Sequence, residues 1–170
     1  MKIVVLSDTH IPKKAKVLPI ALLAELETAD LILHAGDWQV PEVYTMLSVF
    51  AGVEGVHGNV DNPEVKSLFP EKKIIRAGKF KMGIIHGHGL GKTTEKRAVE
   101  AFSGETVDCI IFGHSHIPVN KYSGDILLFN PGSATDKRRH NRYSYGIIEA
   151  GEELLARHVF FESKLPGILD

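Results

Sequence analysis

Cysteine, tryptophan and net charge are all scarce in this 170-residue sequence, which holds one cysteine, one tryptophan and a formal net charge of -1. A single cysteine cannot form a disulfide within the chain, so a disulfide-stapled scaffold is excluded. A charge near zero lacks the basic excess that general nucleic-acid binding requires. No apolar run approaches the roughly 18 residues of a membrane-spanning helix, and none resembles a secretory leader. We therefore expect a cytoplasmic protein without a membrane span.

The apolar content is that of an ordinary globular protein. Hydrophobic residues make up 44% of the sequence and charged residues 24%, and a chain of this length can bury a substantial core without disulfides or structural metal. We expect one domain over residues 1–170. Cys109 lies in an apolar run, where a buried, reduced thiol is the expected state.

Short apolar runs rich in Val, Ile and Leu recur along the chain, and their length and lack of alternation favour strands buried on both faces. These runs lie at residues 3–6, 31–33, 53–56, 82–85, 109–112 and 126–129. Apolar residues at helical spacing occur over 17–26, 43–50 and 98–102. The last third instead indicates antiparallel hairpins, with strands at 120–129, 143–149 and 154–161. The order of elements predicts an α/β layered domain.

Each of five early strands is followed by residues that can bind a metal. These residues are Asp8 with His10, Asp37, Asn59, His86, and His114 with His116. The five positions follow one another at intervals of 22 to 29 residues, about one strand–helix–strand unit. In an open α/β sheet, sites form in the crevice outside the carboxyl ends of the strands. We therefore expect these side chains to gather at one rim.

The seven candidate ligands comprise two carboxylates, four imidazoles and one amide, which is enough for two divalent ions that share a bridging group. A set of nitrogen and oxygen donors without thiolate argues against a cysteine-type structural zinc site and suits manganese, nickel, iron, zinc or cobalt. We expect two divalent metal ions, with manganese preferred among these five.

The five motifs resemble those of the calcineurin-like metallophosphoesterase superfamily, in the same order, and in particular its small single-domain bacterial and archaeal phosphodiesterase branch. They are Asp8-X-His10, Gly36-Asp37, Gly58-Asn59, His86-Gly87-His88 and Gly113-His114-Ser115-His116. The resemblance implies a four-layer α/β/β/α sandwich, in which two mixed β-sheets are flanked by helices, with the site at the sheet rim.

The resemblance also implies a ligand set and a mechanism. One metal ion would be held by Asp8, His10, Asp37 and His116, and the other by Asp37, Asn59, His86 and His114. Asp37 would bridge the two ions and, with Asn59 and His86, form the catalytic centre. Two ions roughly 3.5 to 4 Å apart lower the pKa of a bridging water and stabilise both oxygens of an in-line displacement. The expected nucleophile is metal-bound hydroxide, and the expected substrate is a small-molecule or nucleotide phosphodiester.

One position departs from the family pattern. Many members have a histidine directly after the motif asparagine, where it can protonate the leaving group, but this sequence has Val60. General acid catalysis typically contributes roughly 10² to 10⁴ in rate. We therefore expect slow turnover of alkyl phosphomonoesters and faster hydrolysis of diesters with acidic leaving groups. His57, His88 and Asp61 are the candidates for a substitute proton donor.

Two other functions compete with the enzyme hypothesis. A non-catalytic binding scaffold could keep the fold, as a eukaryotic retromer subunit that resembles this branch does. A scaffold is free to lose metal ligands, however, and all seven are present here. A nucleotide P-loop at Gly91-Lys92-Thr93 is rejected, because the glycine that it requires five positions earlier is His86. The sequence leaves the oligomeric state open, and a homo-oligomer is compatible with it.

For five further residues in or near the motifs and the strands, a structural role competes with a functional one. His34 lies in a buried run and is expected to be a hydrogen-bonded core or site-supporting histidine. Trp38 could stack on a substrate or lie partly buried at the rim. His88 could act beside the ligands or be a plain loop residue. His140 and His158 are expected at the surface.

Two segments also keep two interpretations. The turn Asn130–Ser133 has proline and glycine where a tight reversal would use them, and it could in addition support the site. The segment 136–142 holds four cationic side chains. It could steer an anionic substrate or simply be a solvated loop.

Overall fold

The computed structural model describes residues 1–163, which form ten strands and four helices. The strands are β1 Lys2–Leu6, β2 Leu31–His34, β3 Gly52–Gly55, β4 Lys72–Ala77, β5 Phe80–Ile85, β6 Cys109–Ile111, β7 Val119–Ser123, β8 Ile126–Asn130, β9 Tyr143–Ala150 and β10 Leu154–Phe161. The helices are α1 Ile20–Leu26, α2 Glu42–Ser48, α3 Pro63–Leu68 and α4 Thr94–Ala101. Residues 164–170 lie outside the described residues, so one domain over 1–170 stays a prediction.

The strands form two mixed five-stranded sheets. The first has the order β10-β9-β1-β2-β3, in which β1, β2 and β3 are parallel and β9 and β10 are antiparallel additions. The second has the order β4-β5-β6-β8-β7, in which β5, β6 and β8 are parallel and the outer strands are antiparallel. The antiparallel hairpins expected in the last third are confirmed as β7–β8 and β9–β10, one in each sheet.

Alternating side chains of the strands divide the core into layers. Ile3 and Val5 of β1 face the second sheet and join a cluster that contains Ile84 of β5. Val4, between them, faces the opposite way and packs with Leu22 of α1. The first sheet therefore buries one face against the second sheet and the other against helices.

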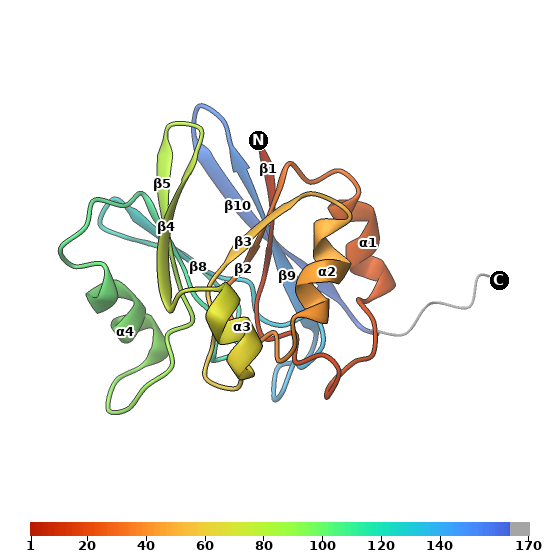
Figure 1. Ribbon diagram of the computed structural model, residues 1–170. Coiled ribbons are helices and arrows are strands. Elements are labelled where there is room, and N and C mark those ends of the chain that lie inside the picture. The colour runs from red at the N-terminus through yellow and green to blue at the C-terminus, as the bar shows by residue number, and fades with distance from the viewer. Residues whose placement is uncertain (164–170) are drawn as a thin grey trace.

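The second sheet has the same arrangement on its far side. Ile110 of β6 packs with Ala98 of α4, whereas Cys109, one residue earlier, points into the cluster between the sheets. Figure 1 shows α4 on one side of the molecule and α1 and α2 on the other, with the strands between them. The four-layer α/β/β/α sandwich is therefore confirmed, and Cys109 is buried as expected.

Two elements were not predicted. The helix α3 begins at Pro63, which has no amide hydrogen to satisfy, and Asn62 caps it by accepting a bond of 2.9 Å from the Val65 amide. Its single fully buried residue, Val65, gives almost no helical periodicity. The strand β4 lies at a sheet edge and mixes lysine and arginine with isoleucine, so it has no continuous apolar run.

Two expected features are wrong in detail. Val53 and Glu54 of β3 are only partly buried, because β3 is the edge strand of its sheet and has a neighbour on one side only. The first helix begins at Ile20 rather than at Val17, since Pro19 occupies the N-cap position. Val17 is 64% exposed. None of the helices in residues 1–163 is long and apolar enough to cross a membrane.

Candidate metal centre

Loops that follow five parallel strands meet at one rim of the sandwich. In the first sheet, the amides of Asp8 and His10 donate to the carbonyls of Gly36 and Asp37, at 2.9 and 3.1 Å. The loop after β6 in the second sheet reaches across, because the His114 amide donates to Asp8 Oδ2 at 2.9 Å. These bonds bring together residues that are up to 106 positions apart in the sequence.

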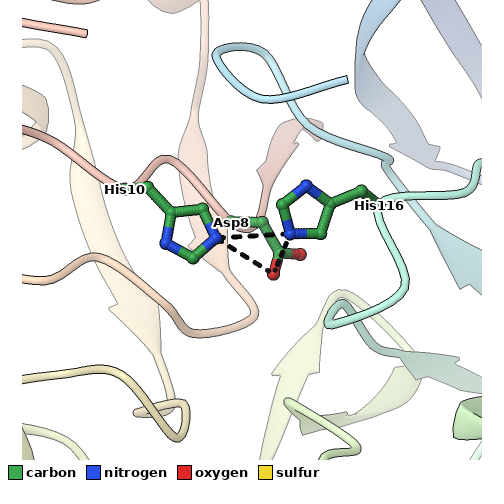
Figure 2. Close-up of side chains that lie close together, drawn as sticks. All are labelled: Asp8, His10 and His116. Carbon is green, nitrogen blue, oxygen red and sulfur yellow. Dashed lines mark hydrogen bonds and ion pairs between the residues drawn. The ribbon is translucent and has the colours of Figure 1, made fainter. Parts of the chain in front are cut away.

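Asp8, His10 and His116 form the first group of possible ligands, with one donor atom from each within 4.8 Å of the others. His116 Nε2 lies 3.2 Å from Asp8 Oδ1, and His10 Nε2 lies 3.8 Å from the same oxygen. The two imidazole nitrogens are 3.2 Å apart. Figure 2 shows both rings turning these nitrogens toward the carboxylate. All three residues are buried.

Asp37, His86 and His114 form the second group, again with donor atoms within 4.8 Å of one another. Asp37 Oδ2 lies 3.2 Å from His86 Nε2. The same carboxylate oxygen is 3.8 Å from His10 Nε2 of the first group. Asp37 therefore lies between the two groups, where the bridging ligand is expected.

In both Asp8 and Asp37, the two carboxylate oxygens have different surroundings. Asp8 Oδ2 accepts bonds from the Ser7 hydroxyl at 2.7 Å and the His114 amide, and Asp37 Oδ1 accepts one of 3.1 Å from the Val60 amide. The other oxygen of each carboxylate faces the histidines. One oxygen thus fixes the side chain, and the second is available for a cation.

Three buried donor atoms fit the expected metal ions. Asp8 Oδ1, His86 Nε2 and His114 Nδ1 have no hydrogen-bond partner within residues 1–163. Buried polar atoms are nearly always satisfied, so such a cluster requires an explanation. Imidazole nitrogen and carboxylate oxygen are suitable ligands for divalent transition ions. The residues present therefore fit two divalent cations.

The charges within the two groups also favour the binding of divalent cations. Burial alone would raise the pKa of Asp8, but contact with His116 and the charge of His86 hold it well below its ordinary value. Burial opposes protonation of His86, but Asp37 and Asp8 outweigh it and raise the pKa of His86 to about 9. Two buried carboxylates that favour the protonated imidazole make the site electrostatically favourable for a cation, and metal binding there would displace that proton.

The backbone is unusual at five of the seven expected ligands. Asp8, His10, Asp37, His114 and His116 have φ angles between 46° and 64°. Residues other than glycine rarely adopt this left-handed conformation, and where they do, the surrounding structure must hold them in it. Such outliers concentrate at functional sites, and here they direct the side chains of three different loops inward.

Two glycines allow the loops to approach this closely. A Cβ atom at Gly58 would overlap the Asp37 carboxylate, and one at Gly113 would overlap the Ser7 hydroxyl. Any larger residue at either position would displace a carboxylate or the side chain that binds it. The motif glycines are thus explained by contact with the expected ligands.

Backbone carbonyls orient two of the histidines. His86 Nδ1 lies 2.8 Å from the Ala35 carbonyl and His116 Nδ1 lies 2.5 Å from the Asp136 carbonyl. A carbonyl can only accept, so each Nδ1 carries the hydrogen and each Nε2 is left to face the centre. No sequence motif indicates these two partners, because any residue supplies a carbonyl.

The turn Asn130–Ser133 supports the site. The side-chain amide of Asn130 donates through Nδ2 to the Gly113 carbonyl at 2.9 Å, and the Ser133 hydroxyl donates to the Asp8 carbonyl at 2.8 Å. Both residues are buried. The turn therefore fixes a loop of the first metal group and the loop that carries His114, and the supporting interpretation is the one that the structure favours.

The remaining expected residues lie around the second group. Asn59 is exposed and lies between Gly58 and Val60, both of which contact Asp37. The Asp61 carboxylate accepts bonds from the amides of Gly58 at 2.6 Å, Asp37 at 3.1 Å and Gln39 at 2.6 Å. Its position as a backbone clamp explains Asp61 better than a role as proton donor.

His57 and His88 differ in their surroundings. His57 Nδ1 is 3.2 Å from the Gly58 carbonyl. The ring of His88 lies 5.6 Å from that of His86 and 6.4 Å from that of His114, and its Nδ1 is buried without a partner within residues 1–163. Burial and the charge of His86 lower the pKa of His88. His88 is therefore beside the ligands rather than in an isolated loop.

Aromatic residues near the motifs belong to the core. His34 is fully buried, and its nitrogens contact the Thr9 hydroxyl at 3.1 Å and the Gly36 amide at 3.2 Å, as expected of a hydrogen-bonded histidine. Trp38 is fully buried between His34 and Phe69. Both interpretations of Trp38 were therefore wrong.

Two further expectations concern residues outside the centre. The surface position expected of His158 is wrong, because its ring stacks on Phe129 and its Nε2 contacts the Asn130 carbonyl at 2.7 Å. The rejection of a P-loop is consistent with the structure: Thr93 caps α4, and Lys92 pairs with Glu100 at 2.8 Å. Neither side chain is directed to a phosphate site.

Two five-stranded sheets with paired Asp/His groups at a common rim define a metallophosphoesterase, a hydrolase of phosphate esters. Residues 1–153 match the family model of the calcineurin-like phosphoesterase superfamily domain, and the chain belongs to this superfamily. A probable metallophosphoesterase of Methanothermobacter thermautotrophicus is 38% identical over 140 residues, which cover 81% of this chain and 80% of the relative. The family expected from the motifs is confirmed.

Solved structures with the same fold include proteins of two kinds. Wild-type Vps29 from Entamoeba histolytica, complexed with Zn2+, has a TM-score of 0.75 at 25% identity and covers 94% of this chain and 99% of its own. A novel archaeal phosphodiesterase has a TM-score of 0.74 at 21% identity, with 95% and 100% of the two chains covered. The second likeness is evidence for the fold alone.

Proposed function

We propose that the protein is a phosphodiesterase that uses two divalent metal ions, with manganese as the preferred pair, to hydrolyse small-molecule or nucleotide phosphodiesters. The observation that carries the proposal is the set of buried donor atoms on Asp8, His86 and His114 that make no hydrogen bond within residues 1–163, next to the bridging position of Asp37. Two divalent ions held there would supply an activated water and would neutralise charge on the phosphoryl oxygens.

The residues of the chain would divide this work. Asp8, His10 and His116 would hold the first ion, and His86 and His114 the second. Asp37 would help to hold both ions, while the Val60 amide keeps its Oδ1 in place. Asn59 would complete the second group from its exposed position.

The expected preference for diesters with acidic leaving groups over alkyl monoesters rests on the residue after Asn59. Val60 has a 44% exposed side chain and no proton to give. An acidic leaving group departs without being protonated, whereas the alkoxide of an alkyl monoester needs a general acid to protonate it. His88 is the titratable side chain best placed to compensate, because its ring lies beside His86 and His114.

A non-catalytic scaffold of the same fold is the less favoured alternative. A scaffold does not need its ligands, yet all seven ligand-type residues are kept. Five of them have a backbone conformation that only a constrained site explains. Left-handed conformations at five residues on three loops destabilise the fold and bring no benefit to a surface that only binds a partner.

The experiment removes metal with a chelator and adds back manganese, nickel, iron, zinc, cobalt or magnesium one at a time. Hydrolysis of bis(p-nitrophenyl) phosphate and of p-nitrophenyl phosphate is then measured. The proposal predicts that activity requires metal, is highest with manganese and favours the diester. Activity that survives chelation would refute the mechanism, and metal binding without hydrolysis of either ester would support the scaffold.

A further inference from the structure

The basic segment 136–142 adjoins the metal centre. His116 Nδ1 lies 2.5 Å from the Asp136 carbonyl, so the first residue of the segment contacts a proposed metal ligand. A cavity of about 430 Å3 opens beside His116, with Ser115 to Ile117 on one wall and residues 137–140 on the other. Sites of this volume hold ligands the size of a nucleotide. The cavity therefore continues the metal centre toward the basic segment.

Hydrogen bonds hold the segment in this position. The Asp136 amide donates to the Ser133 hydroxyl oxygen at 2.8 Å, and that hydroxyl donates to the Asp8 carbonyl. The His140 amide closes a turn onto the Lys137 carbonyl at 2.8 Å. A loop anchored at its start and closed by its own turn can present side chains in a defined direction, which a freely solvated loop cannot.

The charge of the segment is not balanced at the cavity. Its single acid, Asp136, is 3.5 Å from Lys14. Within residues 1–163, neither Arg138 nor Arg139 makes an ion pair, although both line the cavity. Unpaired cations beside a cleft raise the local concentration of anions.

Arg138 and Arg139 both line the cavity beside His116. Arginine binds phosphate through a planar fork of donors, which makes it well suited to a second phosphate group. The neighbouring Ile117 is 58% exposed and gives the same cavity an apolar surface.

We infer that this cavity is an anion-binding subsite, and that the substrate is a nucleotide-sized phosphodiester that carries a second phosphate group. This inference rests on the proposed function, because the scissile phosphate is taken to lie at the metal centre. Arg138 and Arg139 bind the second phosphate, and Ile117 contacts the part of the substrate between the two phosphates.

The test compares two substrates with one leaving group. Thymidine 5′-(p-nitrophenyl phosphate) and the same compound with an added 3′-phosphate release the same p-nitrophenol, so a difference in kcat/KM reports the second phosphate. We expect the 3′-phosphate to raise kcat/KM about tenfold at low ionic strength. In the double variant Arg138→Gln and Arg139→Gln, the ratio should fall to about one, because both charges are removed at nearly constant side-chain length.

A matched control separates local from overall charge. Arg76 in β4 and Arg157 in β10 are both exposed. Arg76 lies opposite Lys81 in the β4–β5 ladder, and Lys81 is near the start of β5, whereas His86 follows its end. The double variant Arg76→Gln and Arg157→Gln has the same net charge as the test variant. It should keep the wild-type ratio, and an equal loss in both variants would overturn the subsite.

Binding gives a readout that does not depend on turnover. Thymidine 3′,5′-bisphosphate should bind the protein as purified more tightly than thymidine 5′-phosphate in equilibrium dialysis, and the arginine variant should lose this preference. Equal kcat/KM for the two substrates would overturn the subsite and leave the phosphodiesterase proposal intact. If neither ester is hydrolysed, the proposed function fails, and the dialysis experiment alone tests the subsite. Tighter binding of the bisphosphate that is lost in the Arg138/Arg139 variant would support the subsite. Equal binding of the bisphosphate and the monophosphate to the wild type would overturn it.

Discussion

The hydroxyl of Ser133 donates a hydrogen bond of 2.8 Å to the backbone carbonyl of Asp8, across 125 residues of sequence. The same hydroxyl oxygen accepts bonds from the amides of Thr135 at 3.2 Å and Asp136 at 2.8 Å. Ser133 is only 1% exposed. One buried side chain thus joins the loop of the first metal group to the segment that lines the neighbouring cavity.

Replacing Ser133 with alanine should weaken both folding and metal binding. The change removes the hydroxyl that accepts from the amides of Thr135 and Asp136 and donates to the Asp8 carbonyl, which costs about 1–3 kcal/mol in unfolding free energy. It also frees the Asp8 loop, so the affinity for manganese should fall. Urea denaturation and metal titration measure the two effects. Ser123→Ala, an exposed serine of β7, is the control, and indistinguishable results for the two variants would contradict the assigned role.

Asp37→Asn should abolish most of the activity. The amide keeps the shape of the side chain but removes the negative charge between the two groups, where Oδ2 lies 3.2 Å from His86 Nε2. We expect kcat on bis(p-nitrophenyl) phosphate to fall at least about 100-fold, with less bound metal, because the bridging ligand is lost. Metal analysis of the purified protein accompanies the kinetics. Asp125→Asn, in the exposed turn after β7, makes the same charge change and should have no effect.

Gly58→Ala should disrupt the centre, whereas Gly52→Ala should not. A Cβ at Gly58 would overlap the Asp37 carboxylate and lie 2.6 Å from the Asp37 amide nitrogen, but nothing lies within 4 Å of a Cβ at Gly52. Gly52 begins β3 and Gly58 lies in the loop that follows it, so the two glycines form a matched pair. We expect Gly58→Ala to destabilise the fold by about 1–3 kcal/mol and to reduce metal content. Equal stability and metal content in both variants would show that the close approach is not required.

Cys109 should be unreactive in the native protein. The thiol is buried between the sheets, and burial raises its pKa far above its ordinary value, so almost no thiolate forms at pH 8. A chromogenic disulfide reagent should therefore label it only after unfolding in urea. The labelling rate at increasing urea concentration then measures the opening of the core. Rapid labelling without denaturant would contradict the burial of the Cys109 side chain between the two sheets.

The spacing of the motifs predicted that their side chains would gather at one rim. Asp8 and Asp37 each follow a strand of a strand–helix unit, and parallel neighbours necessarily place such positions at the same edge of a sheet. His114 belongs to the other sheet; its spacing from His86 predicted the same rim, whereas the family pattern assigned it to the second metal group. The ligand roles of the seven residues remain proposals, and the geometry that supports them is the pair of buried groups.

What the sequence did not indicate depends on contacts between distant parts of the chain. Trp38 follows Asp37 directly, yet it is buried because Phe69, from beyond α3, covers its ring. The orienting carbonyls of Ala35 and Asp136 have no side-chain signature at all. Asp61 had been considered for its acidity, whereas the three amides that it binds give it a structural role.

Val60→His should place a general acid directly after Asn59. The Val60 amide is 3.1 Å from Asp37 Oδ1 and its side chain is 44% exposed, so an imidazole there can stand beside the metal centre without displacing core residues. For phenyl esters with poor leaving groups we expect kcat/KM to rise roughly 10- to 100-fold, with little change for p-nitrophenyl esters. The plot of rate against leaving-group pKa should become flatter.

Val60→Gln provides the control for this gain, because glutamine has hydrogen-bonding capacity and bulk but no proton to transfer near neutral pH. Its leaving-group dependence should match that of the wild type. If glutamine gives the same gain as histidine, substrate binding rather than proton transfer is responsible. If the wild type already shows a flat dependence, a competent acid is present, and His88→Gln and His57→Gln would then identify it by restoring the slope.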